Sequence, residues 1–325
     1  SNIGKNSGNI HDSLYAKALV IENKNTRIVV LSMDLLTAGG IGGYTVDFIP
    51  DLYKQLKSEL GIDSKNLLVN VSHNHRGGMV ADDVVNKTIL AVRSAIQNME
   101  AVKIGAGSGF EDRITMNRRV KLKNGKAYTI RAATPDVPDE EIEGTGEIDP
   151  EIGILKIDRM DGSTKAVLYN FSCHPLLGVP DGSFTAAYPA FASGVIEDQL
   201  GKGIMALFLQ GAGADVIEVT FKNVNSVKDA EPIGRSLGLS TLKALRNIQT
   251  GKNTQLSIIN ETIFIFSWTS IYLMEKIILS VVSYSSLFKS IENADAKFGI
   301  KYMIMTAKVN ITLNALCLFF FIFNP

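Results

Sequence analysis

Two histidines lie one residue apart where an apolar segment opens into a glycine-rich loop. His73 and His75 belong to Ser72-His73-Asn74-His75-Arg76-Gly77-Gly78, which directly follows the apolar residues 67–71. Imidazole is the commonest side-chain ligand for zinc, and ligand sites of α/β proteins gather at the carboxyl ends of strands. The pattern therefore indicates a metal site, although two solvated loop histidines would have the same spacing.

A second predicted strand, residues 165–172, also ends at a histidine, in Cys173-His174-Pro175. If the two strands are neighbours in one sheet, His174 meets His73 or His75 at the edge of that sheet. A catalytic zinc normally has three protein ligands, so a carboxylate, a cysteine or a tyrosine would have to add to the imidazoles. We expect Cys173 to be a buried structural thiol, because its side chain should point away from that of His174. His11 has no comparable setting.

A third predicted strand, residues 205–209, runs into the turn Gln210-Gly211-Ala212-Gly213-Ala214-Asp215. Glycines allow a backbone to approach a ligand closely. A phosphate-binding loop is not indicated, because no Gly-Lys-Ser/Thr follows. A tight turn with Asp215 in solvent explains the pattern equally well.

Together these segments resemble the neutral/alkaline non-lysosomal ceramidase family. The matching residues occur in the family's order over about residues 8–262: residues 12–20, Ser72-His73-Asn74-His75, Asn117-Arg118, Cys173-His174-Pro175 and residues 210–215. The resemblance implies a zinc-dependent amidohydrolase. Such an enzyme cleaves the N-acyl amide bond of ceramide, so the implied partner is a lipid-like N-acyl substrate.

The resemblance also implies roles for individual residues. His73 and His174 take the positions of the family's two zinc histidines, and His75 takes that of a histidine that could pass a proton to the leaving amine. Arg118 takes the position of a substrate-site arginine that could stabilise an oxyanion, although a surface pair with Arg119 is the alternative. Asp215 is the carboxylate of the matching glycine-rich turn and is assigned to the catalytic site.

The sequence departs from the family pattern at three points. Ile217 replaces a serine proposed as a nucleophile, so only attack by a zinc-activated water remains. Ala187 replaces an aspartate, and the family's glutamate and tyrosine zinc ligands have no match. The alternatives are an inactive ceramidase-like remnant without a complete metal site, or a metal-dependent hydrolase of another ester or amide.

The predicted fold is α/β, with a mixed β-sheet core, flanking helices and the site at the carboxyl ends of strands. Residues 1–262 are predicted to form an incomplete ceramidase-like N-terminal catalytic domain. Residues 263–325 are an apolar tail that we interpret as out-of-frame translation or a broken gene end. The expected elements are strands at residues 15–22 and 27–34, helices at 47–60 and 82–98, and a loop at 135–150.

The composition indicates which binding partners and which cellular compartment to expect for this chain. The 325 residues include 33 lysines and arginines and 33 aspartates and glutamates. This balance gives no electrostatic reason to expect binding to nucleic acid. Two cysteines do not indicate a disulfide framework. Residues 263–284 are interrupted by Glu275 and Lys276, and the run 313–323 is too short to span a bilayer. The cytoplasm is favoured, with secretion the alternative if an N-terminal signal has been lost; the oligomeric state is undetermined.

Overall fold

Strands that are apolar on both faces dominate the core, and this pattern is typical of sheets that are covered on both sides. The computed structural model describes residues 2–5, 8–39, 47–130, 137–220, 227–252, 256, 258, 306–308 and 318–320. In β3 (Arg27–Met33), for example, Val29 and Leu31 face the opposite side from Ile28 and Val30. Each face therefore has a different packing partner.

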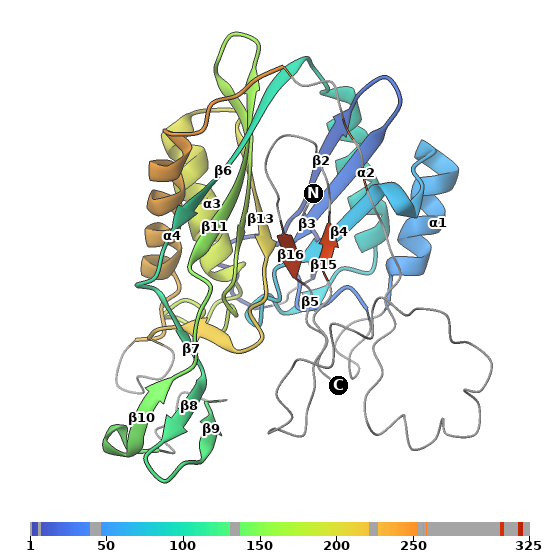
Figure 1. Cartoon of the computed structure of the whole chain (residues 1–325). Helices are drawn as coiled ribbons and strands as arrows, with labels where there is room; N and C mark the ends of the chain where they lie inside the picture. Colours follow the sequence, from blue (N-terminus) through green and yellow to red (C-terminus); the bar gives the residue numbers. More distant parts are fainter. Residues whose placement is uncertain are drawn as a thin grey trace, which may run out of the picture.

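The core consists of two sheets that pack face to face between two layers of helices (Figure 1). The first sheet has the order β2 (Ala16–Glu22), β3, β4 (Leu67–Val71), with β3 and β4 parallel. The second sheet has four strands, and the edge strand β13 runs parallel to its neighbour β12. Its order is β13 (Met205–Gln210), β12 (Thr164–Phe171), β11 (Glu151–Arg159), β6 (Val102–Phe110).

Four helices cover the outer faces of the sheets. The helices α1 (Ile49–Leu60) and α2 (Val84–Gln97) pack on the first sheet, and α3 (Ala187–Leu200) and α4 (Glu231–Leu245) pack on the second. A third apolar cluster fills the space between the sheets. The predicted class, a mixed β-sheet core with flanking helices, is confirmed, and the core comprises two sheets.

The remaining described elements are shorter. They are β1 (Gly4–Lys5), β5 (Met79–Val80), β7 (Thr115–Asn117), β8 (Arg119–Leu122), β9 (Ala127–Thr129), β10 (Ile142–Thr145), β14 (Val216–Glu218), β15 (Thr306–Lys308), β16 (Leu318–Phe320) and the 3-10 turns η1 (Ser64–Asn66) and η2 (Asp139–Glu141). Strands β8, β9 and β10 form a small sheet that projects from the sandwich (Figure 1).

The predicted element positions agree with the structure to within a few residues, with one exception. Gly61 ends α1 in a left-handed conformation, as its position predicts. The interval 135–150 is not simply a loop, because β10 within it pairs with β8. The predicted tail, residues 263–325, lies outside the described residues except for β15 and β16. In the described part of the chain, no helix has the length and apolarity needed to cross a membrane.

Side chains of the first sheet form hydrogen bonds with the backbone groups along the free edge of β13. Lys17 Nζ donates to the carbonyl of Ala206 (2.8 Å), and Ser32 Oγ donates to that of Phe208 (2.6 Å). Asn70 forms two bonds to the backbone of Gln210, one donated by Nδ2 (3.1 Å) and one accepted by Oδ1 (2.8 Å). These bonds fix the position of one sheet relative to the other.

Asn70→Ala should destabilise the fold by about 2–4 kcal/mol, because each buried polar group left without a partner costs about 1–3 kcal/mol. The matched control is Asn98→Ala, since Asn98 also donates through Nδ2 to a carbonyl, that of Ser94, but is exposed. The control should change stability by less than about 1 kcal/mol. Urea denaturation of both variants gives the comparison, and equal losses would contradict the proposed importance of the Asn70 bonds.

Candidate functional site

Three of the four histidines converge at one point. Nε2 of His75 lies 2.8 Å from Nε2 of His174 and 3.4 Å from Nε2 of His73. The ring centroids are 4.5–4.9 Å apart. Within the described residues this is the one group of three or more possible ligands that could hold a metal ion. Three imidazole nitrogens suit a divalent transition metal such as zinc.

The strands that carry these histidines are not neighbours in one sheet. β4 is the edge strand of the first sheet, whereas β12 lies inside the second sheet, next to β13. The bonds between Asn70 and Gln210 hold β4 against β13, and β13 runs parallel to β12. The carboxyl ends of β4 and β12 therefore lie at the same end of the sandwich, across the interface between the sheets.

The ring of His73 is fixed by its backbone and by a carbonyl. His73 has φ 60°, a left-handed conformation that is costly for residues other than glycine and that is typical of functional sites. Its Nδ1 lies 2.8 Å from the carbonyl oxygen of Leu36. A carbonyl only accepts, so Nδ1 carries the proton and Nε2 of neutral His73 keeps its lone pair for a ligand.

Hydrogen bonds join the loop of His75 to the loop of His174. The backbone N–H of His75 donates to the carbonyl of Pro175 (3.2 Å), and Nε of Arg76 donates to that of Leu176 (2.7 Å). Asn74, which is 2% exposed, anchors the first loop by donating to the carbonyl of Thr185 (2.8 Å). The loops are thus held together by bonds that do not involve the imidazoles.

Glu218 supports the loop after His174 and was missed by reasoning from the sequence. Its carboxylate is fully buried and accepts from the backbone N–H groups of Leu176 and Leu177 at 3.0–3.1 Å. The strand that holds it also accepts at Val216 from the N–H of His174 (2.8 Å). Burial raises the pKa of Glu218 to about 7. The only sequence signal is an acidic residue that directly follows two apolar ones.

Burial keeps the three imidazoles neutral. It is the largest cause of a lowered pKa at each ring, and it brings the pKa of His75 to about 4 and that of His174 to about 3. The positive charge of Arg118 contributes to the lowered pKa of all three rings. Neutral imidazole is the form that binds metals, so the environment favours the metal-binding state at neutral pH.

Arg118 and Arg119 have different surroundings. The backbone N–H of Arg118 donates to the carbonyl of Asp215 (2.7 Å), and its charge acts on the histidine cluster. The Arg119 side chain is 59% exposed, and its Nε lies 3.9 Å from Oδ2 of Asp215. That oxygen also accepts from Nδ2 of Asn117 (3.3 Å). The carboxylate of Asp215 is therefore held by Asn117 and Arg119, and its catalytic role stays a prediction.

Four other positions of interest in the sequence make structural contacts and do not join the histidine cluster. Ile217 is fully buried and bridges to the backbone of His174. Ala187 begins α3 with φ 56°, and the carboxylate of Asp12 binds the turn before it by accepting from the N–H of Ala186 (2.7 Å). Cys173 is a buried free thiol, as predicted. Nδ1 of His11 lies 2.8 Å from Oδ2 of Asp12, outside the cluster.

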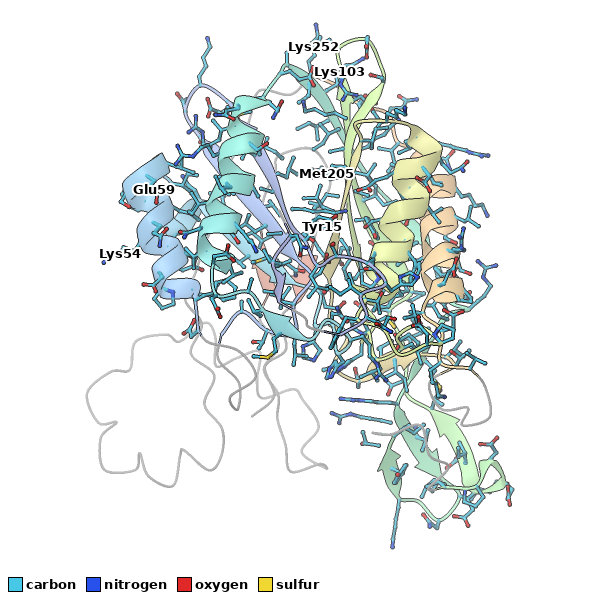
Figure 2. All side chains as sticks on the ribbon, turned by 180° about the vertical axis from the view of Figure 1, so that it is seen from behind. Tyr15, Lys54, Glu59, Lys103, Met205 and Lys252 are labelled. Carbon is cyan, nitrogen blue, oxygen red and sulfur yellow. The ribbon has the colours of Figure 1, made fainter. Side chains whose placement is uncertain are left out.

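A cleft of about 1680 Å³ is lined by residues of both sheets and of the helices α2 and α3. The residues that line it include Tyr15 and Met205, both labelled in Figure 2, and Lys17 and Asp34. Burial raises the pKa of Asp34 to about 6. None of the three clustered histidines lines this cleft, so the volume of the cleft does not make it the candidate metal site.

Comparisons with known proteins agree with the fold. No family model and no curated protein matches the sequence. Two solved structures match with a TM-score of 0.59: a ceramidase complexed with C2, at 16% identity, and the neutral ceramidase of Pseudomonas aeruginosa, at 17%. Each match covers 80% of this chain, but only 43% and 44% of the respective structure. The chain has the fold of neutral ceramidases and spans less than half of their length.

Glu218→Gln should remove a pH dependence of stability. Because the pKa is raised in the folded state, Glu218 stabilises the fold below about pH 4.5 and loses that contribution as the pH rises to about 7. The stability of the wild type relative to the variant should fall by up to about 3 kcal/mol between pH 5 and pH 8. Guanidinium denaturation with a chelator present measures this difference, and the comparison cancels the titration of the histidines. A difference that does not change with pH would contradict the raised pKa.

Proposed function

We propose that this chain forms part of a metal-dependent hydrolase of ceramidase type, which cleaves the N-acyl amide bond of ceramide or of a related N-acyl lipid. The observation that carries the proposal is the cluster of His73, His75 and His174 at the strand ends of a ceramidase fold. The two solved structures compared above are both ceramidases by their descriptions. Zinc is the proposed metal, because imidazole nitrogens dominate the donor set.

His73 and His174 are the proposed ligands from the two loops. When bound, zinc supplies a Lewis acid that lowers the pKa of water and so provides a nucleophile at neutral pH. The Leu36 carbonyl holds His73 in the tautomer that offers Nε2. Glu218 holds the loop that carries His174. The site needs no nucleophilic side chain, which agrees with the buried Ile217.

Arg118 is proposed to bind the developing oxyanion of the amide carbonyl. Its charge already acts on all three imidazoles, so it lies near the place where that oxygen would form. Asp215 is proposed to act through Arg118, since its carbonyl accepts from the N–H of that arginine (2.7 Å). The resemblance assigns proton transfer to His75, and the geometry favours a different role that is argued below.

His73→Ala and His174→Ala should each lower both zinc affinity and turnover by more than about 100-fold, because even residues that only support ligands contribute about 10–100-fold. Bound zinc is measured by chelator competition, and turnover with a fluorescent N-acyl sphingosine analogue. His11→Ala is the matched control and should change neither quantity.

Each of the other outcomes would favour a different function for this chain. Full turnover in His73→Ala would reject the metal site. Zinc binding without turnover of any amide or ester would favour an inactive remnant. Hydrolysis of generic esters but not of N-acyl amides would favour a hydrolase with a different substrate.

Arg118→Ala should lower kcat by about 10²–10³-fold, the usual loss when one oxyanion donor is removed. Arg119→Ala removes the same charge from the adjacent, exposed position and should change kcat by only a few-fold. Steady-state kinetics on the N-acyl analogue compares the two variants. Equal losses would show that Arg118 acts only through the general positive charge of this region.

A further inference from the structure

We infer that His75 is a third imidazole ligand, so that His73, His75 and His174 together form the metal site of this chain. This inference rests on the proposed metal site. It differs from the role that the family resemblance implies for His75, which is proton transfer without metal contact.

The spacing of the nitrogens fits one shared ion. A tetrahedral zinc with Zn–N distances of about 2.0–2.1 Å separates its ligand nitrogens by about 3.4 Å. The separation between Nε2 of His75 and Nε2 of His73 is 3.4 Å, and that between Nε2 of His75 and Nε2 of His174 is 2.8 Å. The ligand nitrogens of all three rings lie within 4.8 Å of one another, so small movements of the rings would bring them to the coordination distance of one ion.

The tautomer of His73 leaves a nitrogen lone pair that can face an ion among the three rings. Nδ1 of His73 donates to Leu36, so Nε2 of neutral His73 has no proton. Between His75 and His174, one nitrogen must hold a proton for the 2.8 Å contact to be attractive. A metal ion bound by both nitrogens would take the place of that proton, which would then reside on Nδ1 of the same ring. If His75 carries it, the proton can move to Nδ1 through solvent, because the His75 residue is exposed.

The backbone holds His75 in this position. Its N–H donates to the carbonyl of Pro175 (3.2 Å), the residue that follows His174. The neighbouring Arg76 donates to the carbonyl of Leu176 (2.7 Å), and Asn74 is buried and anchored to Thr185. The loop that carries His75 is thus bonded to the loop that carries His174, and Nε2 of His75 lies 2.8 Å from Nε2 of His174.

The consequence is a metal site made entirely by residues 73–174. Three protein ligands are the usual number for a catalytic zinc that keeps an open position. In such a site His73, His75 and His174 would supply all three of these ligands.

X-ray absorption of the zinc-loaded wild-type chain tests the inference directly, because imidazole ligands give characteristic multiple scattering. We expect three imidazoles per zinc, and two would overturn the inference. This measurement needs no substitution, so it is independent of whether a variant folds.

Chelator competition provides the second measurement. His75→Ala should weaken zinc binding by more than about 100-fold, as much as His73→Ala, because loss of a ligand should exceed the 10–100-fold cost of losing a supporting residue. His11→Ala should leave affinity unchanged. Unchanged affinity in His75→Ala would overturn the inference.

The two proposals fail in different ways. A wild-type chain that does not bind zinc would overturn both the metal site and the assignment of His75. Zinc held by three imidazoles without turnover of the N-acyl analogue would reject the hydrolase function and support the assignment of His75. Turnover with zinc held by two imidazoles would support the function and overturn the assignment.

Discussion

The hydrogen bonds along the free edge of β13 are the constraint on which the rest of the structure depends. A buried strand edge must satisfy its backbone groups, and here Lys17, Ser32 and Asn70 do so from three strands of the other sheet. These side chains reach alternate residues of β13, so they fix the distance and the register between the sheets. Without that register, the ends of β4 and β12 would not meet.

The candidate site is a product of this arrangement. It is assembled from two loops that leave different sheets, and the loops are joined by bonds that do not use the imidazoles, such as that from His75 N–H to Pro175. Burial and the charge of Arg118 then keep the rings neutral. Position and protonation state thus both favour metal binding at this cluster.

The likeness to ceramidase structures extends to the fold and does not by itself define the chemistry of the site. At 16–17% identity and a TM-score of 0.59, the fold is retained. The family resemblance implies a nucleophile at position 217, and in this structure Ile217 packs in the core, while Asp12 supports the turn at Ala187. A fold can keep its layers while its site changes, because packing requires apolar volume and chemistry requires particular atoms.

The sequence by itself determined the elements, the burial of Cys173 and the three strand-end histidines, because the periodicity of a strand and the residues at its end are local properties. The tertiary structure decided that two sheets, not one, form the core. It also decided that Nε2 of His75 points at the other imidazoles, that Glu218 is buried, and that the carboxylate of Asp215 contacts Asn117. These outcomes depend on contacts such as that between Asn70 and Gln210, which are 140 residues apart. Contacts over such separations leave no pattern in the spacing of residues along the chain.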